Sequence, residues 1–342
     1  YSGDELIVRG SLESLGEEAI HPNECMLFDE RQFVERSAWN AAHSDFQHVC
    51  EPFDETAEIA WTPVWSLGGR RRLLPTGYLY YGVPVEVGGA AVQADSNGSA
   101  AGSSLEDAIL QGALELVERD AVALWWYNRT PVAGVDLGSF GEPWLTEMVR
   151  QYADLGRELW VLDVTSDLGV PVMVALSRRL DQQREQVLFG FGAHFDPWIA
   201  VRRAVSELNQ MLPIVLDRGH QLDDPDARRW LEFATVANQP YLRPAAGERA
   251  RTVGDFAFVH RGDVRDDVEA LARTLAVRGI DMLVLDQTRP DIGLPVVKVI
   301  APGLRPFWAR FAPGRLFDVP VQLGRLATPT RYGQLNPFPM FL

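Results

Sequence analysis

Lysine is almost absent from this chain of 342 residues: Lys298 is the only one, and it lies inside the apolar run LPVVKVIAPG. A P-loop needs the pattern G-x-x-x-x-G-K-[ST], and a protein kinase needs H-R-D and D-F-G motifs; none of these occurs. The run GFGA at 190–193 lacks the third glycine of the dinucleotide fingerprint. Any bound nucleotide must therefore be held by arginines and by a metal on carboxylates.

Cysteine, long apolar runs and net positive charge are also scarce. Two cysteines, Cys25 and Cys50, are too few for a disulfide framework and indicate a reducing compartment, so we expect a cytoplasmic location. No window approaches the ~20 apolar residues of a membrane span, and YSGDELIVRG does not resemble a signal peptide. The formal net charge of −15 argues against nucleic acid or an anionic membrane as partner. The sequence predicts a soluble protein with a large core.

The most informative stretch is SNGSAAGSSLEDAILQGALELVERDAVALWW, residues 96–126. Ser103 followed by Glu106 is a capping box before an apolar-periodic run, which predicts the start of a helix. One face of this helix carries a narrow polar stripe of Asp107, Gln111, Glu115 and Glu118. Aligned acids repel one another unless a cation neutralises them, and Mg²⁺ with phosphate would do so, with Arg119 as a further phosphate ligand. An ordinary surface pair of Glu115 and Arg119 explains the spacing equally well.

Elsewhere, strand-like runs alternate with helices. Strands are expected at 59–67, 77–87, 157–165, 170–178, 186–193, 280–285 and 294–300, with the third, fourth and fifth adjacent in one sheet. Asp196 and Pro197 predict the start of a second helix, which runs to about Leu212. Its polar face carries Arg203, Glu207 and Gln210, and its spacing faintly repeats that of the first helix.

The predicted class is a mixed α/β (α+β) fold, with mixed sheets flanked by helices and two acidic helices forming a nucleotide site. Further helices are expected at 225–236 and 264–278. The segment 213–260, rich in Pro, Arg and Asp, is expected to be an insertion or edge subdomain. The tail 333–342 ends in NPFPMFL, whose prolines prevent regular structure and whose apolar side chains should pack into a groove.

Taken in order, several segments resemble the YcaO-domain family, in particular the azoline-forming cyclodehydratases, or D proteins, of thiazole/oxazole-modified peptide biosynthesis. The matching pieces are SNGSAAG with LEDAILQGALELVERDAVALWWYNR, then GFGAHFDPWIAVRRAVSELNQ, LVLDQTRPDIGLPVVKVIAPGL, APGRLFDVP and the tail. They span nearly the whole chain, so the ordered set outweighs the surface-pair interpretation of the first helix. We expect 1–342 to be a YcaO-like domain that lacks the family's N-terminal segment, because residues 1–3 resemble those that follow the family's first E-x-x-E-R motif.

The resemblance implies ATP and Mg²⁺ as cofactors and a specific set of ligands. The cofactor-binding residues would be Asp107, Glu115, Glu118, Arg119, Arg203, Glu207 and Gln210, and the metal ligands Asp107, Glu115, Glu118 and Glu207. It also implies that Pro337, Pro339 and Leu342, the last through a terminal carboxylate, assist proton transfer; the tail keeps only P-F-P of the family's P-x-P-x-P.

The implied reaction is ATP-dependent cyclisation of Cys, Ser or Thr residues in a ribosomally made precursor peptide to azolines. The implied partners are that peptide, an E1-like protein that binds its leader, and an FMN-dependent azoline dehydrogenase; a homodimer is also compatible. Two alternatives stay open. One is another YcaO chemistry, thioamide or amidine formation, and the other is a non-catalytic scaffold with an incomplete ATP site.

Overall fold

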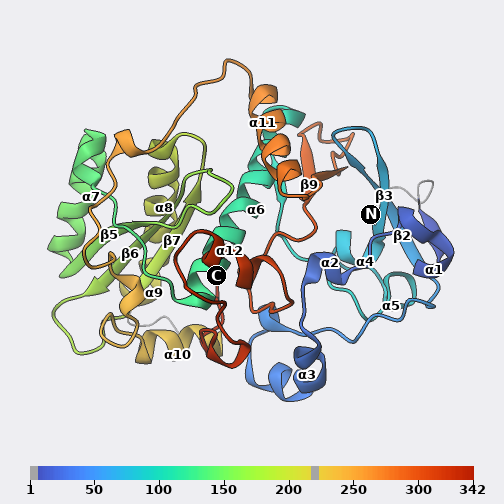
Figure 1. Cartoon of the computed structure of the whole chain (residues 1–342), viewed down its shortest axis with the longest axis horizontal. Coiled ribbons are helices and arrows are strands. Elements are labelled where there is room, and N and C mark those ends of the chain that lie inside the picture. Colours follow the sequence, from blue (N-terminus) through green and yellow to red (C-terminus); the bar gives the residue numbers. More distant parts are fainter. Residues whose placement is uncertain (1–6, 217–222) are drawn as a thin grey trace.

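The computed structural model describes residues 7–216 and 223–342, and Figure 1 shows their arrangement. The long helix α6 (Leu105–Asn128) runs between two β-sheets and contacts both of them. Three of its aromatic side chains, Trp125, Trp126 and Tyr127, are buried at its C-terminal end. The helix predicted from the 96–126 stretch is therefore the central element of the molecule.

The larger sheet has the strand order β1-β2-β8-β9-β4, with β3 also paired to β2, and its named strand pairs are antiparallel. Its strands are β1 (Val8–Gly10), β2 (Ile59–Ser66), β3 (Arg71–Pro75), β4 (Ser99–Ala101), β8 (Leu283–Asp286) and β9 (Val296–Ile300). The smaller sheet has the order β5-β6-β7, also antiparallel. It comprises β5 (Arg157–Asp163), β6 (Val172–Arg179) and β7 (Leu188–Ala193), so the predicted adjacency of these strands is confirmed.

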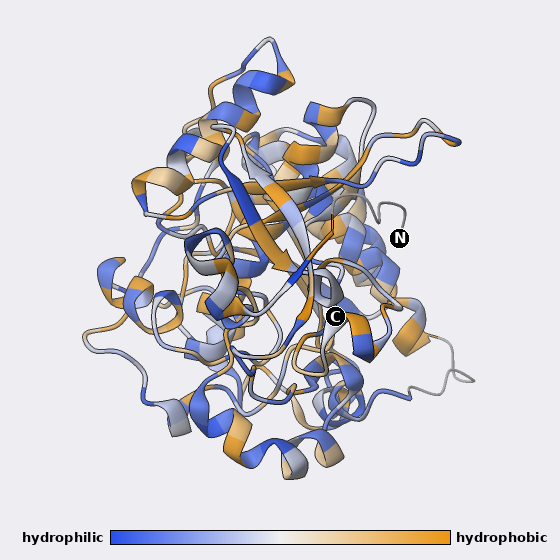
Figure 2. Cartoon of the chain, turned by 90° about the vertical axis from the view of Figure 1, so that its right-hand side faces the viewer, coloured by the Kyte–Doolittle hydropathy of each residue, from blue (hydrophilic) through white to orange (hydrophobic). Residues whose placement is uncertain are grey.

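Helices lie around and between the sheets. α7 (Pro143–Asp154) and α8 (Pro197–Met211) pack on the smaller sheet, and α11 (Val264–Val277) and α12 (Arg315–Gln322) pack on α6. The other helices are α1 (Leu12–Leu15), α2 (Asn23–Met26), α3 (Glu30–Ala42), α4 (Thr76–Leu79), α5 (Val85–Gly88), α9 (Pro213–Leu216) and α10 (Pro225–Phe233). Several helices at the periphery mix hydrophilic and hydrophobic residues in Figure 2, as amphipathic helices do. No helix within the described ranges is both long and apolar enough to cross a bilayer.

The strand predicted at 77–87 is wrong, because this segment forms α4 and α5, and the strand that pairs with β2 is β3. The reason is a close backbone approach: a Cβ at Gly77 would lie 2.9 Å from the carbonyl oxygen of Gly88. Tyr78 and Leu79 are buried by this packing. Tertiary contact thus outweighs the strand propensity of the YLYY run.

The segment 213–260 contributes to the main core. Trp230 is fully buried, with its ring centroid 4.7 Å from that of Trp126, and Tyr241 packs against Trp125 at 5.3 Å. Both side chains belong to the same hydrophobic cluster as α6 and Met340 of the tail.

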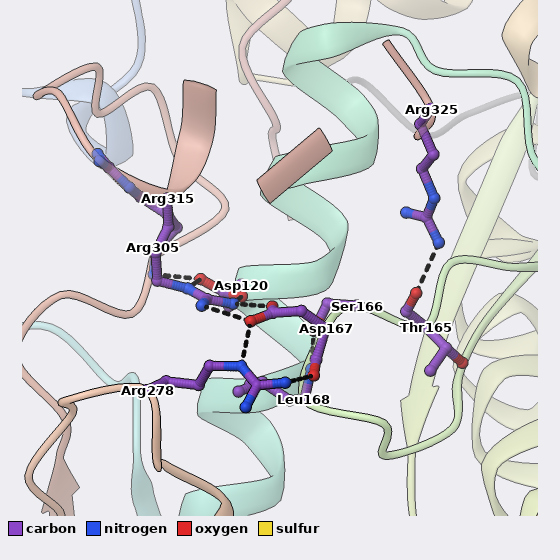
Figure 3. Close-up of polar contacts among 9 residues, drawn as sticks. All are labelled: Asp120, Thr165, Ser166, Asp167, Leu168, Arg278, Arg305, Arg315 and Arg325. Atoms are coloured by element: carbon purple, nitrogen blue, oxygen red, sulfur yellow. Dashed lines mark hydrogen bonds and ion pairs between the residues drawn. The ribbon is translucent and has the colours of Figure 1, made fainter. Parts of the chain in front are cut away.

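A buried ion-pair network joins distant segments around α6 (Figure 3). The Arg315 guanidinium donates to both carboxylate oxygens of Asp120, at 2.9 and 2.6 Å, and to Asp167 at 2.8 Å. Arg278, just after α11, donates to Asp167 at 2.9 Å. Because Asp120 is fully buried, its charge depends on these partners.

Candidate active site

The two predicted acidic helices are joined at the candidate site by a hydrogen bond from Arg203 of α8 to Gln111 of α6. Glu115 and Glu118 lie on α6 and Glu207 on α8, and their charges interact. Burial, opposed by Arg119 and reinforced by Glu207 and Glu115, raises the pKa of Glu118 to about 8. Burial also raises the pKa of Glu207. Glu118 and Glu207 therefore share a poorly hydrated region in which a cation would favour their ionised forms.

Two of these glutamates bind the backbone of a neighbouring strand segment. The amide of Gly98, just before β4, donates to Glu115 Oε2 at 3.1 Å, and the amide of Phe191 in β7 donates to Glu207 Oε2. Glycines permit this approach, because a Cβ at Gly112 of α6 would lie 2.5 Å from the Gly98 carbonyl oxygen and one at Gly190 2.2 Å from the Leu208 nitrogen. The faint repeat between the helices thus corresponds to a shared local geometry.

Two arginines face the carboxylates. Arg119 donates to Glu115 at 3.2 Å and lies over the Phe307 ring, 3.9 Å from its centroid. Its buried Nε has no hydrogen-bond partner among the described residues. Arg203 donates to the Ala193 carbonyl oxygen at 3.1 Å and reaches from α8 to Gln111 on α6.

The start of α6 differs by one residue from the predicted capping box. Ser104, not Ser103, is the N-cap, and its side chain accepts from the Asp107 amide at 3.2 Å. The Ser103 amide and hydroxyl both donate to Asp107 Oδ2 at 2.9 Å. The hydrogen bond from the Ser103 amide lowers the pKa of Asp107. Glu106 is exposed. Asp107 therefore takes part in the helix cap, and its Oδ1 also accepts a hydrogen bond from Gln111 Nε2 on the polar stripe, at 3.0 Å.

Lys298 is a site residue that the sequence did not reveal. Its ammonium, with the residue only 1% exposed, donates to the carbonyl oxygens of Asp95 at 2.7 Å and Asn97 at 3.2 Å. It thereby fixes the loop whose next residue, Gly98, is bound by Glu115. The position of this lone lysine in an apolar strand was the available signal, because a buried lysine needs partners.

The tail packs against the hydrophobic cluster that surrounds α6. Buried Asn336 donates to the Trp126 carbonyl oxygen at 3.2 Å and to the Tyr241 hydroxyl at 3.0 Å. The Leu342 carbonyl oxygen accepts from Trp308 Nε1 at 3.1 Å, next to the Phe307 ring on which Arg119 stacks. Of the predicted catalytic prolines, Pro339 is buried and Pro337 is exposed.

The chemistry of the site fits a magnesium-bound nucleotide. No three Asp, Glu, His or Cys side chains in 7–216 and 223–342 already converge as a metal-ligand set. Mg²⁺ held with a nucleotide needs only one or two protein carboxylates, because phosphate oxygens and water complete its shell. Glu118 and Glu207 would supply such carboxylates, and Arg119 and Arg203 would supply phosphate donors. Exposed Gln210 lies one turn beyond Glu207.

Comparison with known proteins identifies the family. The model of the YcaO cyclodehydratase family, described as ATP- and Mg²⁺-binding, matches residues 1–305. The chain belongs to the YcaO cyclodehydratase family. This confirms the predicted family and its fold class, together with ATP and Mg²⁺ as the cofactors of the YcaO domain.

Solved YcaO structures resemble the chain closely. It superposes on a heterocyclase in complex with substrate and cofactor with a TM-score of 0.93, and on the heterocyclase TruD with 0.92, at 44% identity in both cases. These matches include 99% and 100% of the present chain, which in turn spans only 46% and 48% of the two heterocyclase chains. YcaO from Methanopyrus kandleri, bound with AMPPCP and Mg²⁺, shares the fold at 22% identity and a TM-score of 0.61, with 88% of this chain and 70% of that one covered.

A sequence relative, an uncharacterized protein of Methanothermobacter thermautotrophicus, is 29% identical over 262 residues. The match covers 74% of this chain and 67% of the relative.

Proposed function

We propose that the complete protein forms azolines from Cys, Ser or Thr residues of a ribosomally made peptide at the expense of ATP. The observation that carries this proposal is the meeting of Glu118 and Glu207 with two arginines in a site where burial raises the pKa of Glu118 to about 8. The 44% identity to a heterocyclase over nearly the whole chain supports the same reaction.

The proposed reaction consists of an addition, a phosphoryl transfer and an elimination. The substrate thiol or hydroxyl adds to the preceding amide carbon and loses its proton, and the carbonyl oxygen becomes an oxyanion. That oxygen takes the γ-phosphoryl group of ATP and ADP departs. The C–O bond then breaks, phosphate leaves, and loss of the amide proton gives the C=N bond of the ring. The peptide loses one water in total.

Side chains of the protein would bind the phosphate oxygens and the metal ion in these steps. Arg119 and Arg203 would bind phosphate oxygens, and the stacking of Arg119 on Phe307 orients its guanidinium. Mg²⁺, when bound, would neutralise the charge that develops as the phosphoryl group transfers. Glu118 would be ionised as a ligand of Mg²⁺, because the cation offsets the burial that raises its pKa.

We also propose that the remaining predicted ligands act in the same site. Asp107, Glu115 and Gln210 would complete the nucleotide and metal contacts. Pro337, Pro339 and Leu342 would border the cyclising peptide, which the hydrogen bond from Trp308 to Leu342 supports.

The test is incubation of the complete protein with a cognate peptide, its leader-binding partner, ATP and Mg²⁺, followed by mass spectrometry. Loss of one water per modified residue is expected. Glu118→Gln and Glu207→Gln should each reduce turnover by at least ~100-fold, whereas Glu106→Gln, an exposed acid on the same helix, should keep it. Exchange of oxygen for sulfur would instead establish thioamidation, and unchanged turnover in both glutamine variants would refute the assigned site.

Partners and location belong to the same proposal. The precursor peptide, an E1-like leader-binding protein and an FMN-dependent dehydrogenase would act with this chain, which would work in the cytoplasm, either alone or as a homodimer. Cys25 and Cys50 are both buried as free thiols, which suits a reducing compartment.

A further inference from the structure

A separate cavity of about 170 Å³ has no predicted nucleotide or metal ligand in its lining. Its lining includes the buried side chains Cys25, Met26, Phe28 and Cys50. Two exposed aromatic residues, Phe46 and Tyr81, also line it, at 53% and 69% exposure. It is therefore a small apolar cavity with aromatic residues that solvent can reach.

The charged residues of the cavity are engaged within the protein. The Arg310 guanidinium lies 4.3 Å from the centroid of Phe28 and donates to the carbonyl oxygens of Ala309 and Phe46, at 3.1 and 3.3 Å. Asp95 accepts from the Asn97 amide at 3.0 Å and from Lys298 at 3.5 Å. The remaining carboxylate, exposed Asp45, would repel a phosphate. The cavity thus suits an uncharged, apolar group.

Its volume matches one side chain. An apolar protein cavity of about 150 Å³ is known to accept benzene. The 170 Å³ cavity therefore accommodates one aromatic or branched aliphatic side chain.

Three parts of its lining are close in sequence to residues of the candidate active site or interact with them. Ser96 is in the loop that leads to Gly98, which Glu115 binds. Pro306 and Trp308 flank Phe307, on which Arg119 stacks, and Trp308 also binds the tail at Leu342. Tyr81, beside Ser96, lies within electrostatic range of Glu115.

We propose that this cavity receives one apolar side chain of the substrate peptide, from a residue adjacent to the one that is cyclised. The inference rests on the proposed function, because it assumes that a peptide is present at the carboxylates. Adjacent residues of a peptide are about 3.8 Å apart at their Cα atoms, so a peptide that places one residue at the reaction centre places its neighbour beside it. The cavity then selects among substrate residues by size and polarity.

The experiment compares peptides that carry Phe, Leu, Ala or Asp next to a single cyclisable Cys, using the complete protein and mass spectrometry to obtain kcat/KM. Wild-type protein should prefer Phe or Leu over Ala by about 10-fold or more. Ala94→Phe, which fills the cavity, and Phe46→Ala, which opens its rim, should each reduce this preference to about twofold or less, with KM for ATP unchanged. The matched control is Trp65→Ala, a 50% exposed aromatic on β2 outside the cavity, which should keep the full preference.

Three results would overturn the inference. The first is an unchanged side-chain preference in both cavity variants, and the second is a wild-type protein that dehydrates all four peptides equally; both leave the proposed function intact. The third is an Ala94→Phe protein with higher KM for ATP and intact peptide preference, which would assign the cavity to the nucleotide. If the wild type dehydrates no peptide at all, the proposed function itself fails. Since Phe46 is exposed, Phe46→Ala should fold even if Ala94→Phe does not.

Discussion

Glu118 and Lys298 are two enclosed ionisable side chains that differ in how far their surroundings compensate the charge. The Lys298 ammonium has two carbonyl oxygens and a carboxylate within 3.5 Å, so its charge is compensated inside the protein. Glu118 has carboxylates among its neighbours and a pKa raised to about 8, so its ionised form lacks sufficient compensation. Lys298 therefore stabilises the structure, whereas the Glu118 carboxylate needs a bound proton or a nearby cation to offset its burial.

Glu118→Gln should stabilise the protein in the absence of Mg²⁺ and nucleotide, and more so at high pH. The folded-state pKa of about 8 exceeds the ordinary value of 4.5, so folding stability is lost as the pH rises from 4.5 through 8. Thermal unfolding should show a Tm gain of about 2 °C or more at pH 8.5 and almost none at pH 5. An equal gain at both pH values would contradict the raised pKa.

Lys298→Met should destabilise the protein by about 2–4 kcal/mol, because it leaves the Asp95 and Asn97 carbonyl oxygens buried without their donor. It should also weaken ATP binding, since the loop before Gly98 loses its anchor. Denaturant unfolding and nucleotide titration measure the two effects. Lys298→Arg should recover part of both, and normal ATP affinity in the methionine variant would show that the loop does not depend on the lysine.

At the scale of elements, α6 and α8 lie close to strand segments because glycine occurs where they touch. Gly112 of α6 lies against the Gly98 carbonyl oxygen, and Gly190 of β7 lies against the backbone of α8. These contacts bring Glu115 and Glu207 within hydrogen-bonding distance of strand amides, so the packing of helix on strand also builds the site.

Gly98→Ala and Gly69→Ala form a matched pair. Both glycines have positive φ, at 74° and 79°, but only at Gly98 would the added Cβ meet backbone, 2.1 Å from the Val299 oxygen. Gly69→Ala should cost about 1 kcal/mol of unfolding free energy. Gly98→Ala should cost at least ~3 kcal/mol and reduce ATP binding, and similar losses in the two variants would indicate that strain at φ, and not contact, sets the cost.

At the scale of the whole molecule, the tail connects segments that are far apart in sequence. Asn336 binds the end of α6 and Tyr241, the Gln47 side chain donates to the Met340 carbonyl oxygen, and Phe341 packs 5.3 Å from the Phe189 ring centroid. Arg315, at the start of α12, joins Asp120 of α6 to Asp167, which lies between β5 and β6 (Figure 3). The fold of the described residues therefore depends on contacts between segments that are far apart in sequence.

Asn336→Asp should release the tail, because the carboxylate cannot donate to the Trp126 carbonyl oxygen or the Tyr241 hydroxyl. Hydrogen exchange of residues 336–342 should accelerate about 10-fold or more, and turnover should fall with it. Pro337→Ala, at an exposed position, is the control and should change the exchange little. Unchanged exchange in Asn336→Asp would mean that the apolar contacts alone hold the tail.

Local patterns account for what was predicted correctly. Caps and periodicity gave α8 its start at Pro197, and β-rich runs gave the three strands of the smaller sheet. The strand predicted at 77–87 failed because the contact of Gly77 with Gly88 is a property of packing. The lysine anchor could not be predicted, because Lys298 and its carbonyl partners are more than 200 residues apart.

The sequence by itself determined the two acidic helices, the near-absence of lysine and the order of motifs that marks the family, since these depend on residue type and spacing along the chain. Only the tertiary structure decided that Arg203 reaches Gln111, 92 residues away, and that Lys298 anchors the loop before Gly98. It alone also gave Glu118 its raised pKa and formed a separate apolar cavity. The physical reason is that desolvation and long-range contact exist only once segments distant in sequence have packed together.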